Sequence, residues 1–124
     1  MILPFSVALE ITLDTPNSVD INEEFAAIID ADSQDTFDIK IFVHNSEDEK
    51  IKADEYISEI YNNDWDNPWF YVQESFPEIK EYGIRVIESP GERKICVRFR
   101  KSDTKTTNTK CNPIVVLETE PVEK

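Results

Sequence analysis

Apolar and polar residues alternate along several stretches of this chain. The clearest stretch places an apolar residue at every odd position from 5 to 13, and most of the residues between them are polar. Side chains of a β-strand point alternately to its two faces, so this period of two predicts a strand with one buried face and one exposed face. The same period returns at residues 25–29, 37–43, 82–86 and 95–99. The repetition predicts an all-β protein whose half-buried antiparallel sheets pack as a sandwich.

Turn-forming residues separate the alternating stretches and set the expected strand order. Residues 18–22 are expected to form a short edge segment that crosses between sheets, and residues 62–68 have the composition of a loop. Residues 82–88 and 92–101 are expected to pair as a hairpin, and residues 111–117 to return as the last strand. About seven to eight strands at this spacing are typical of a Greek-key sandwich.

Length and composition suit one domain with its own core. The chain has 124 residues, of which 40% are hydrophobic, enough to fill a core without metals or several disulfides. We assign residues 1–118 to this domain and residues 119–124 to an acidic linker or tail. No apolar stretch is long enough to span a bilayer, and the first residues do not have the composition of a signal peptide. The chain is therefore expected to be either cytoplasmic or a domain of a longer exported protein.

The net charge narrows the choice of partners. Twenty-six acidic residues against 13 basic ones give a formal charge of −13. Such a surface repels phosphate backbones and anionic lipids, which disfavours nucleic acids and membranes as partners. A solvated acidic surface is the simplest explanation of the charge, and divalent-cation binding or a salty environment are the alternatives.

Residues 74–86 resemble the penultimate-strand region of immunoglobulin-like and fibronectin-like modules. In these modules a bend, here at Phe76 and Pro77, precedes a tyrosine, here Tyr82, that is followed by alternating apolar residues. The opening part, through Val19 and residues 23–29, is similar to their first two strands. The chain departs from antibody domains, because the second strand has no cysteine and no core tryptophan follows it.

The resemblance implies an immunoglobulin-like antiparallel sandwich of the kind found in surface and secreted proteins of prokaryotes, archaea in particular. Such modules serve as spacers, as adhesion units or as appendages to enzymes. Fold analogy alone does not choose among these roles.

Cys96 and Cys111 are the most specific local feature. They lie on consecutive expected strands, and the midpoint between them falls at the expected hairpin tip. Residues so placed face each other across the ladder, within reach of a disulfide. Cys96 shares its strand face with Arg98 and Arg100, so the pair is expected to be exposed. A disulfide indicates an exported protein, and the alternative is two unrelated reduced thiols.

A cluster of aromatic residues is the second candidate site. Its members are interleaved with Asn and Asp residues, and they are Tyr61, Trp65, Trp69 and Tyr71. Carbohydrate-binding modules stack aromatic faces on sugar rings and use polar side chains to bind the hydroxyls. The alternative is that Trp69 and Tyr71 point into the core while Trp65 caps one end of the sandwich.

Four aspartates form the third candidate site: Asp30, Asp32, Asp35 and Asp38. Carboxylate oxygens at this spacing can converge on a hard cation such as calcium, although the glycine of an EF-hand loop is absent. A plain solvated turn is the alternative.

Catalysis is disfavoured. The chain has one histidine, His44, which we expect at the surface at the end of a strand, and it has neither a nucleophile elbow nor a glycine-rich phosphate loop. His44 and two cysteines are also too few for a tetrahedral zinc site. We therefore expect a non-catalytic structural or adhesion module of an extracellular or cell-surface protein or filament. A carbohydrate-binding module and a calcium-stabilised spacer are the alternatives.

Contacts with flanking domains or with like subunits are the expected partnerships, with polysaccharide as a further candidate. The regular, apolar stretch at residues 5–13 is a candidate for pairing with the sheet edge of another chain.

Overall fold

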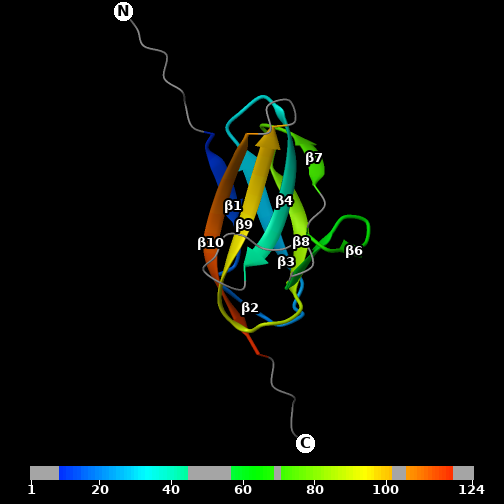
Figure 1. Cartoon of the computed structure of the whole chain (residues 1–124), viewed down its shortest axis with the longest axis vertical. Helices are drawn as coiled ribbons and strands as arrows, with labels where there is room; N and C mark the ends of the chain where they lie inside the picture. Colours follow the sequence, from blue (N-terminus) through cyan, green and yellow to red (C-terminus); the bar gives the residue numbers. More distant parts are fainter. Residues whose placement is uncertain (1–8, 45–56, 69–70, 102–105, 119–124) are drawn as a thin grey trace, which may run out of the picture.

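The computed structural model describes residues 9–44, 57–68, 71–101 and 106–118, which form two facing β-sheets (Figure 1). The first sheet has the strand order β1 (Ile11–Asp14), β3 (Phe25–Ala31), β8 (Lys80–Val86), β5 (Ser58–Tyr61) and β6 (Trp65–Asp66). The second sheet has the order β2 (Ser18–Asp20), β10 (Thr107–Leu117), β9 (Gly91–Lys101), β4 (Thr36–His44) and β7 (Val72–Ser75). The described residues thus form an all-β sandwich of ten strands, and they contain no helix that is long and apolar enough to cross a membrane.

The core lies between the two sheets, where the alternating apolar residues meet. Ile29 and Ile84 of the first sheet and Ile39, Ile95 and Phe99 of the second are fully buried there. β3 shows the alternation along its whole length, since every second residue from Phe25 to Ala31 is buried and those between are half-exposed. The period of two therefore identifies the buried face correctly.

Most sequence-based strands are present, with shifted ends. The stretch at residues 5–13 corresponds to β1, and its part before residue 9 lies outside the described residues. The short segment at residues 18–22 contains β2, which lies in the opposite sheet from β1, so the chain crosses between the sheets as predicted. Residues 62–68, predicted as a loop, contain the two-residue strand β6. Asn63, with φ of 68°, lies in the turn that joins β5 to β6, and asparagine tolerates this left-handed backbone conformation.

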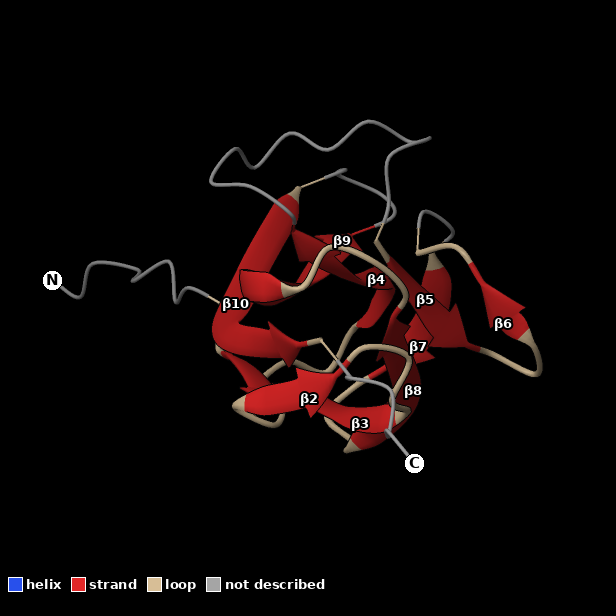
Figure 2. Ribbon diagram, turned by 90° about the horizontal axis from the view of Figure 1, so that it is seen from below, coloured by secondary structure: helices blue, strands red, loops and turns tan. Residues whose placement is uncertain are grey.

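One prediction of strand pairing is wrong. Residues 82–88 and 92–101 do not form a hairpin, because β8 lies in the first sheet and β9 in the second (Figure 2). The turn between them carries the chain from one sheet to the other, and turn composition alone does not distinguish the two cases. The sheets are otherwise antiparallel as predicted, apart from β2, which pairs with the end of β10 in a parallel orientation. The Greek-key connectivity stays a prediction.

Candidate functional site

The outer face of the first sheet carries two of the predicted ligand-binding aromatics. Tyr61 and Trp65 face each other across the β5–β6 ladder, with ring centroids 5.4 Å apart in an edge-to-face arrangement. The same row continues through Gly83 to Ala26, so small residues lie next to the rings. Tyr61 is 47% exposed. β6 projects from the side of the sandwich in both views (Figure 1, Figure 2).

An arginine–glutamate pair holds Trp65 in place. The guanidinium carbon of Arg85 lies 4.1 Å from the centre of the Trp65 ring. Nε and Nη2 of Arg85 are both 2.8 Å from Oε1 of Glu59 on the neighbouring strand. A cation over an indole face is attracted by the ring quadrupole, and the glutamate fixes its direction. The rings of Tyr61 and Trp65, with Arg85 and Glu59 beside them, therefore form a small supported surface, which we call the aromatic shelf.

Tyr71 lies on the opposite side of the sandwich. Its ring stacks under Arg100 of β9, at 3.8 Å from the guanidinium carbon, and 4.8 Å from Nζ of Lys40 on β4. Burial, followed by the charges of Arg98 and Arg100, lowers the pKa of Lys40. Trp69 lies outside the described residues. The structure thus brings Tyr61 and Trp65 together but places Tyr71 on the outer face of the other sheet.

The four aspartates are not gathered around one point. Asp35 Oδ2 is 3.5 Å from Nζ of Lys101 and accepts a hydrogen bond from the Ser33 hydroxyl. Asp38 Oδ2 is 3.4 Å from Nη2 of Arg100. Within the described ranges, no group of three or more acidic, histidine or cysteine residues is placed to hold a metal ion.

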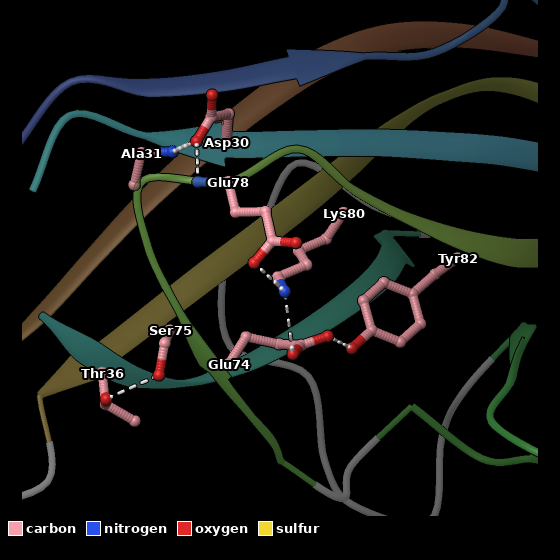
Figure 3. A network of polar contacts seen from close by, with 8 residues as sticks. All are labelled: Asp30, Ala31, Thr36, Glu74, Ser75, Glu78, Lys80 and Tyr82. Atoms are coloured by element: carbon pink, nitrogen blue, oxygen red, sulfur yellow. Dashed lines mark hydrogen bonds and ion pairs between the residues drawn. The ribbon is translucent and has the colours of Figure 1, made fainter. Parts of the chain in front are cut away.

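The carboxylate of Asp30 holds two segments of the chain together through hydrogen bonds. Its Oδ1 accepts hydrogen bonds from the backbone N–H groups of Ala31, at 2.8 Å, and Glu78, at 3.0 Å. It thereby ties the loop before β8 to the end of β3, as Figure 3 shows. Asp32 is exposed, and its backbone N–H donates to the carbonyl of Glu10. Asp30, Asp35 and Asp38 thus use carboxylate oxygens in contacts within the protein, and the calcium site stays a prediction.

The cysteines pair as their positions predict, but their surroundings differ from the expectation. Cys96 and Cys111 are directly opposite each other on β9 and β10 and form a disulfide. Cys111 is exposed, whereas Cys96 is fully buried, although it points away from the inter-sheet core. The prediction that both are exposed is wrong for Cys96. Its cross-strand neighbour on β4 is Phe42, which is only 2% exposed.

His44 is likewise buried rather than exposed. It is 4% exposed at the end of β4, and its ring packs edge-to-face on Phe42 with centroids 4.9 Å apart. The guanidinium of Arg98 lies 5.2 Å from the centre of the same Phe42 ring. Cys96, Phe42, His44 and Arg98 form a second packed layer on the outside of the second sheet, which we call the outer cluster. The run of apolar residues at 41–43, which breaks the alternation, was the sequence signal for it.

A polar network joins the two sheets (Figure 3). The hydroxyl of Tyr82 on β8 donates a hydrogen bond to Glu74 on β7 of the other sheet. Nζ of Lys80 lies 3.8 Å from Glu74 and 2.9 Å from Glu78. Burial, together with the contact to Glu74, raises the pKa of Tyr82 above its ordinary value. The hydrogen bond to Glu78 raises the pKa of Lys80. Tyr82 thus joins the two sheets at this end. It lies on β8, which β9 and β10 follow, so residues 74–86 do not contain the penultimate strand that the resemblance implies.

A groove of about 390 Å³ opens at the side of the sandwich away from β6. It lies between residues 9–12, at the beginning of β1, and residues 108–110 of β10. This groove was not predicted from the sequence. Pro113 within β10 was the available signal, because a proline inside a strand indicates a sheet edge.

Comparisons with known proteins show a shared fold and no family. No protein-family model and no curated protein sequence matches the chain. Among solved structures, a conjugative transposon lipoprotein from Bacteroides eggerthii is similar, with a TM-score of 0.58 and 8% identity over 86% of this chain and 95% of that one. Native alpha-2-macroglobulin from Escherichia coli, from domain MG7 to the C-terminus, has a TM-score of 0.45 and 11% identity over 90% of this chain and 17% of that one.

Proposed function

We propose that this chain is a non-catalytic structural module of an exported or cell-surface protein, built on an immunoglobulin-like sandwich. The observation that carries the proposal is the disulfide between Cys96 and Cys111, of which Cys111 is exposed. Disulfides persist in oxidising compartments and are rare in the cytosol, where an accessible bridge would be reduced.

The strand order supports the immunoglobulin-like assignment. In that fold, strands A, B, E and D form one sheet and strands C, F and G the other. Here β1, β3, β8 and β5 occupy the first four places, and β4, β9 and β10 the other three. The splitting of the first strand into β1 and β2, one in each sheet, fits the same plan. Two strands depart from that plan: β6 adds to the edge of β5, and β7 joins the edge of β4 but follows β5 in the chain.

The similar lipoprotein supports export as well. It is a conjugative transposon lipoprotein, and the match covers 95% of the chain in that solved structure. In this proposal the domain has a structural role, and a role in adhesion would additionally require a ligand-binding surface.

The redox state in the source organism tests the proposal. Cell fractions are quenched in acid, alkylated with a thiol reagent and analysed by mass spectrometry. The chain has two cysteines, so the oxidised form takes no adduct and the reduced form takes two. We expect no adduct, with the protein in the exported or envelope fraction. A sample reduced before alkylation is the control. Two adducts on protein from the cytoplasmic fraction would contradict the proposal.

A second candidate function is polysaccharide binding at the aromatic shelf. It is favoured by the exposed Tyr61 ring beside Trp65, above the small residues of the same row. Calorimetric titration with a panel of soluble polysaccharides tests it. Tyr61→Ala is expected to abolish binding, and Tyr71→Ala, on the other sheet, to leave it unchanged. Equal losses in both variants, or no binding to any polysaccharide, would remove this candidate.

A further inference from the structure

The edge of β1 that faces the groove has no partner strand among the described residues. The carbonyl of Glu10 accepts a hydrogen bond from the N–H of Asp32, beside β3. Backbone groups alternate in direction along an antiparallel ladder. The even-numbered residues therefore pair with β3, and Leu9, Ile11 and Leu13 direct their backbone groups away from it. This edge consequently offers donors and acceptors to the groove.

The facing edge belongs to β10 and has the same property. The N–H of Lys101 donates to the carbonyl of Thr106, next to the β9–β10 ladder. The even-numbered residues of β10 thus pair with β9, while Thr107, Thr109 and Cys111 direct their backbone groups outward. Further along the same edge, β2 provides the partner strand. Over residues 107–111 no described strand does so.

The groove is closed at one end and open at the other. Nδ2 of Asn112 on β10 donates to the carbonyl of Leu13 on β1 at 2.7 Å, which joins the two edges there. The next residue, Pro113, has no N–H to offer. Beyond this junction toward the beginning of β1, the edges bound the groove of about 390 Å³. Its outward backbone groups suit an extended segment that adds to the edge of β10.

The lining indicates the chemistry of that segment. Leu9 and Ile11 are partly buried hydrophobic residues that pack against the core, and one anion and one cation, Glu10 and Lys110, offset each other in the lining. Thr12, Asn108 and Thr109 complete the lining with uncharged polar groups. The groove is therefore locally neutral and partly apolar, on a protein whose net charge is −13. An uncharged segment with alternating apolar residues is the matching occupant.

We propose that residues 1–8 of a second copy of this chain occupy the groove and add a strand to the edge of β10. In a chain with 31% charged residues, the first nine residues contain none, and Phe5, Val7 and Leu9 keep the period of two. Within one chain these residues run directly into Leu9, which lines the groove, so the same chain would have to reverse direction at its mouth. A second copy enters without this reversal.

The exchange is reciprocal. A two-fold axis lets each copy donate its first residues to the groove of the other, because donor and acceptor lie at the same end of β1. Phe5 and Val7 of the donor cover Leu9 and Ile11 of the acceptor. The neutral contact also keeps the two acidic surfaces from meeting directly. The proposal goes beyond the structural module proposed above and does not depend on export.

Sedimentation of the full chain over a wide range of concentration at physiological ionic strength tests the proposal. We expect the mass to rise with concentration from 14.4 kDa to twice that value. Val7→Pro removes a backbone N–H from the exchanged segment. Thr109→Pro removes a backbone N–H from the receiving edge of β10, at a residue whose backbone faces away from β9 as that of Pro113 does. Each variant alone is expected to stay monomeric. Val7→Ile and Thr109→Val, which keep the N–H groups, are the matched controls and are expected to dimerise.

Mixing the two proline variants gives the sharper result. Val7→Pro keeps an intact groove and Thr109→Pro keeps an intact donor, so the mixture is expected to form a heterodimer with one exchanged segment. Ile11→Lys, which places a charge in the groove without altering a backbone N–H, replaces Thr109→Pro if that variant does not fold. A wild-type mass of 14.4 kDa at all concentrations would overturn the proposal. So would a Val7→Pro variant that dimerises like the wild type, or a mixture of folded variants that does not associate.

Discussion

The outer faces of the two sheets differ in how far they follow the alternation of the sequence. On the first sheet, outward residues are half-buried or exposed, and the Tyr61 ring is 47% exposed. On the second sheet, Phe42 and Cys96 also point outward, yet they are as buried as the core residues beside them. The period of two thus tells which side chains point between the sheets. It does not tell whether the opposite face is covered.

The largest expected effect is a difference in stability between two variants, each of which truncates an aromatic side chain on the outer face of one sheet. Phe42→Ala removes a ring that is buried in the outer cluster, and such substitutions cost about 3 to 5 kcal/mol. Tyr61→Ala removes a ring that is 47% exposed, and we expect a cost of about 1 kcal/mol. The free energy of unfolding, from denaturant titration, measures both. Equal costs would show that the two outer faces contribute alike, contrary to the comparison.

The disulfide is expected to have the next largest effect. It closes a loop with a sequence separation of 15, and a loop of this size corresponds to about 3 kcal/mol in the chain-entropy model. We expect reduction of the wild type to lower the free energy of unfolding by about this amount. The double variant Cys96→Ala/Cys111→Ala, measured with and without reductant, is the control and should not respond to the reductant. An unchanged stability of the reduced wild type would contradict the prediction.

The sandwich could be predicted from the sequence because its core residues follow one repeated local pattern. Whether two consecutive strands lie in the same sheet could not be predicted. The turn at residues 89–90 has the composition of a hairpin turn but connects β8 to β9 in the other sheet. The positions of Cys96 and Cys111 could be predicted because a symmetric hairpin places them opposite each other. That Tyr71 and Tyr61 lie on opposite outer faces could not be predicted, because residues near in sequence reach opposite faces when the chain crosses between sheets. The Asn112 contact that closes the groove joins residues far apart in the sequence, and no local signal reports it.

The contact of Tyr82 with Glu74 joins the two sheets and is expected to have an intermediate effect. Tyr82→Phe removes a hydrogen bond to a charged group, which costs about 2 kcal/mol. The pH dependence gives a second readout. The folded state raises the pKa of Tyr82 above its ordinary value of 10.0, so the unfolded chain loses the phenolic proton first as the pH rises.

The contribution of Tyr82 is therefore fully present below pH 10, near the ordinary pKa, and decreases as the pH rises above that value. We expect the stability of the wild type to fall more steeply in alkaline solution than that of Tyr82→Phe. Denaturant titrations at neutral and alkaline pH measure the difference. Parallel pH profiles for the two proteins would contradict this role of the hydroxyl.

The smallest expected effect is the difference in stability between alanine substitutions at the two glycines of the chain, one in each sheet. Gly91 begins β9 with φ of 132°, a conformation that side chains rarely adopt, so Gly91→Ala is expected to cost more than about 1 kcal/mol. Gly83 lies within β8 without such a φ, and an added Cβ would lie 3.2 Å from Cβ of Tyr61 and 3.6 Å from Cη2 of Trp65.

The close contact at Gly83 is with an atom fixed to the backbone of β5, so it cannot swing aside. Replacing a strand glycine by alanine otherwise gains about 0.5 to 1 kcal/mol, and this gain offsets part of the steric cost. We therefore expect Gly83→Ala to change the stability by less than Gly91→Ala does, while the displaced Trp65 changes the fluorescence spectrum. Thermal unfolding and emission spectra of the two variants measure these effects. A larger loss of stability at Gly83 would show that the aromatic shelf is packed as tightly as the outer cluster.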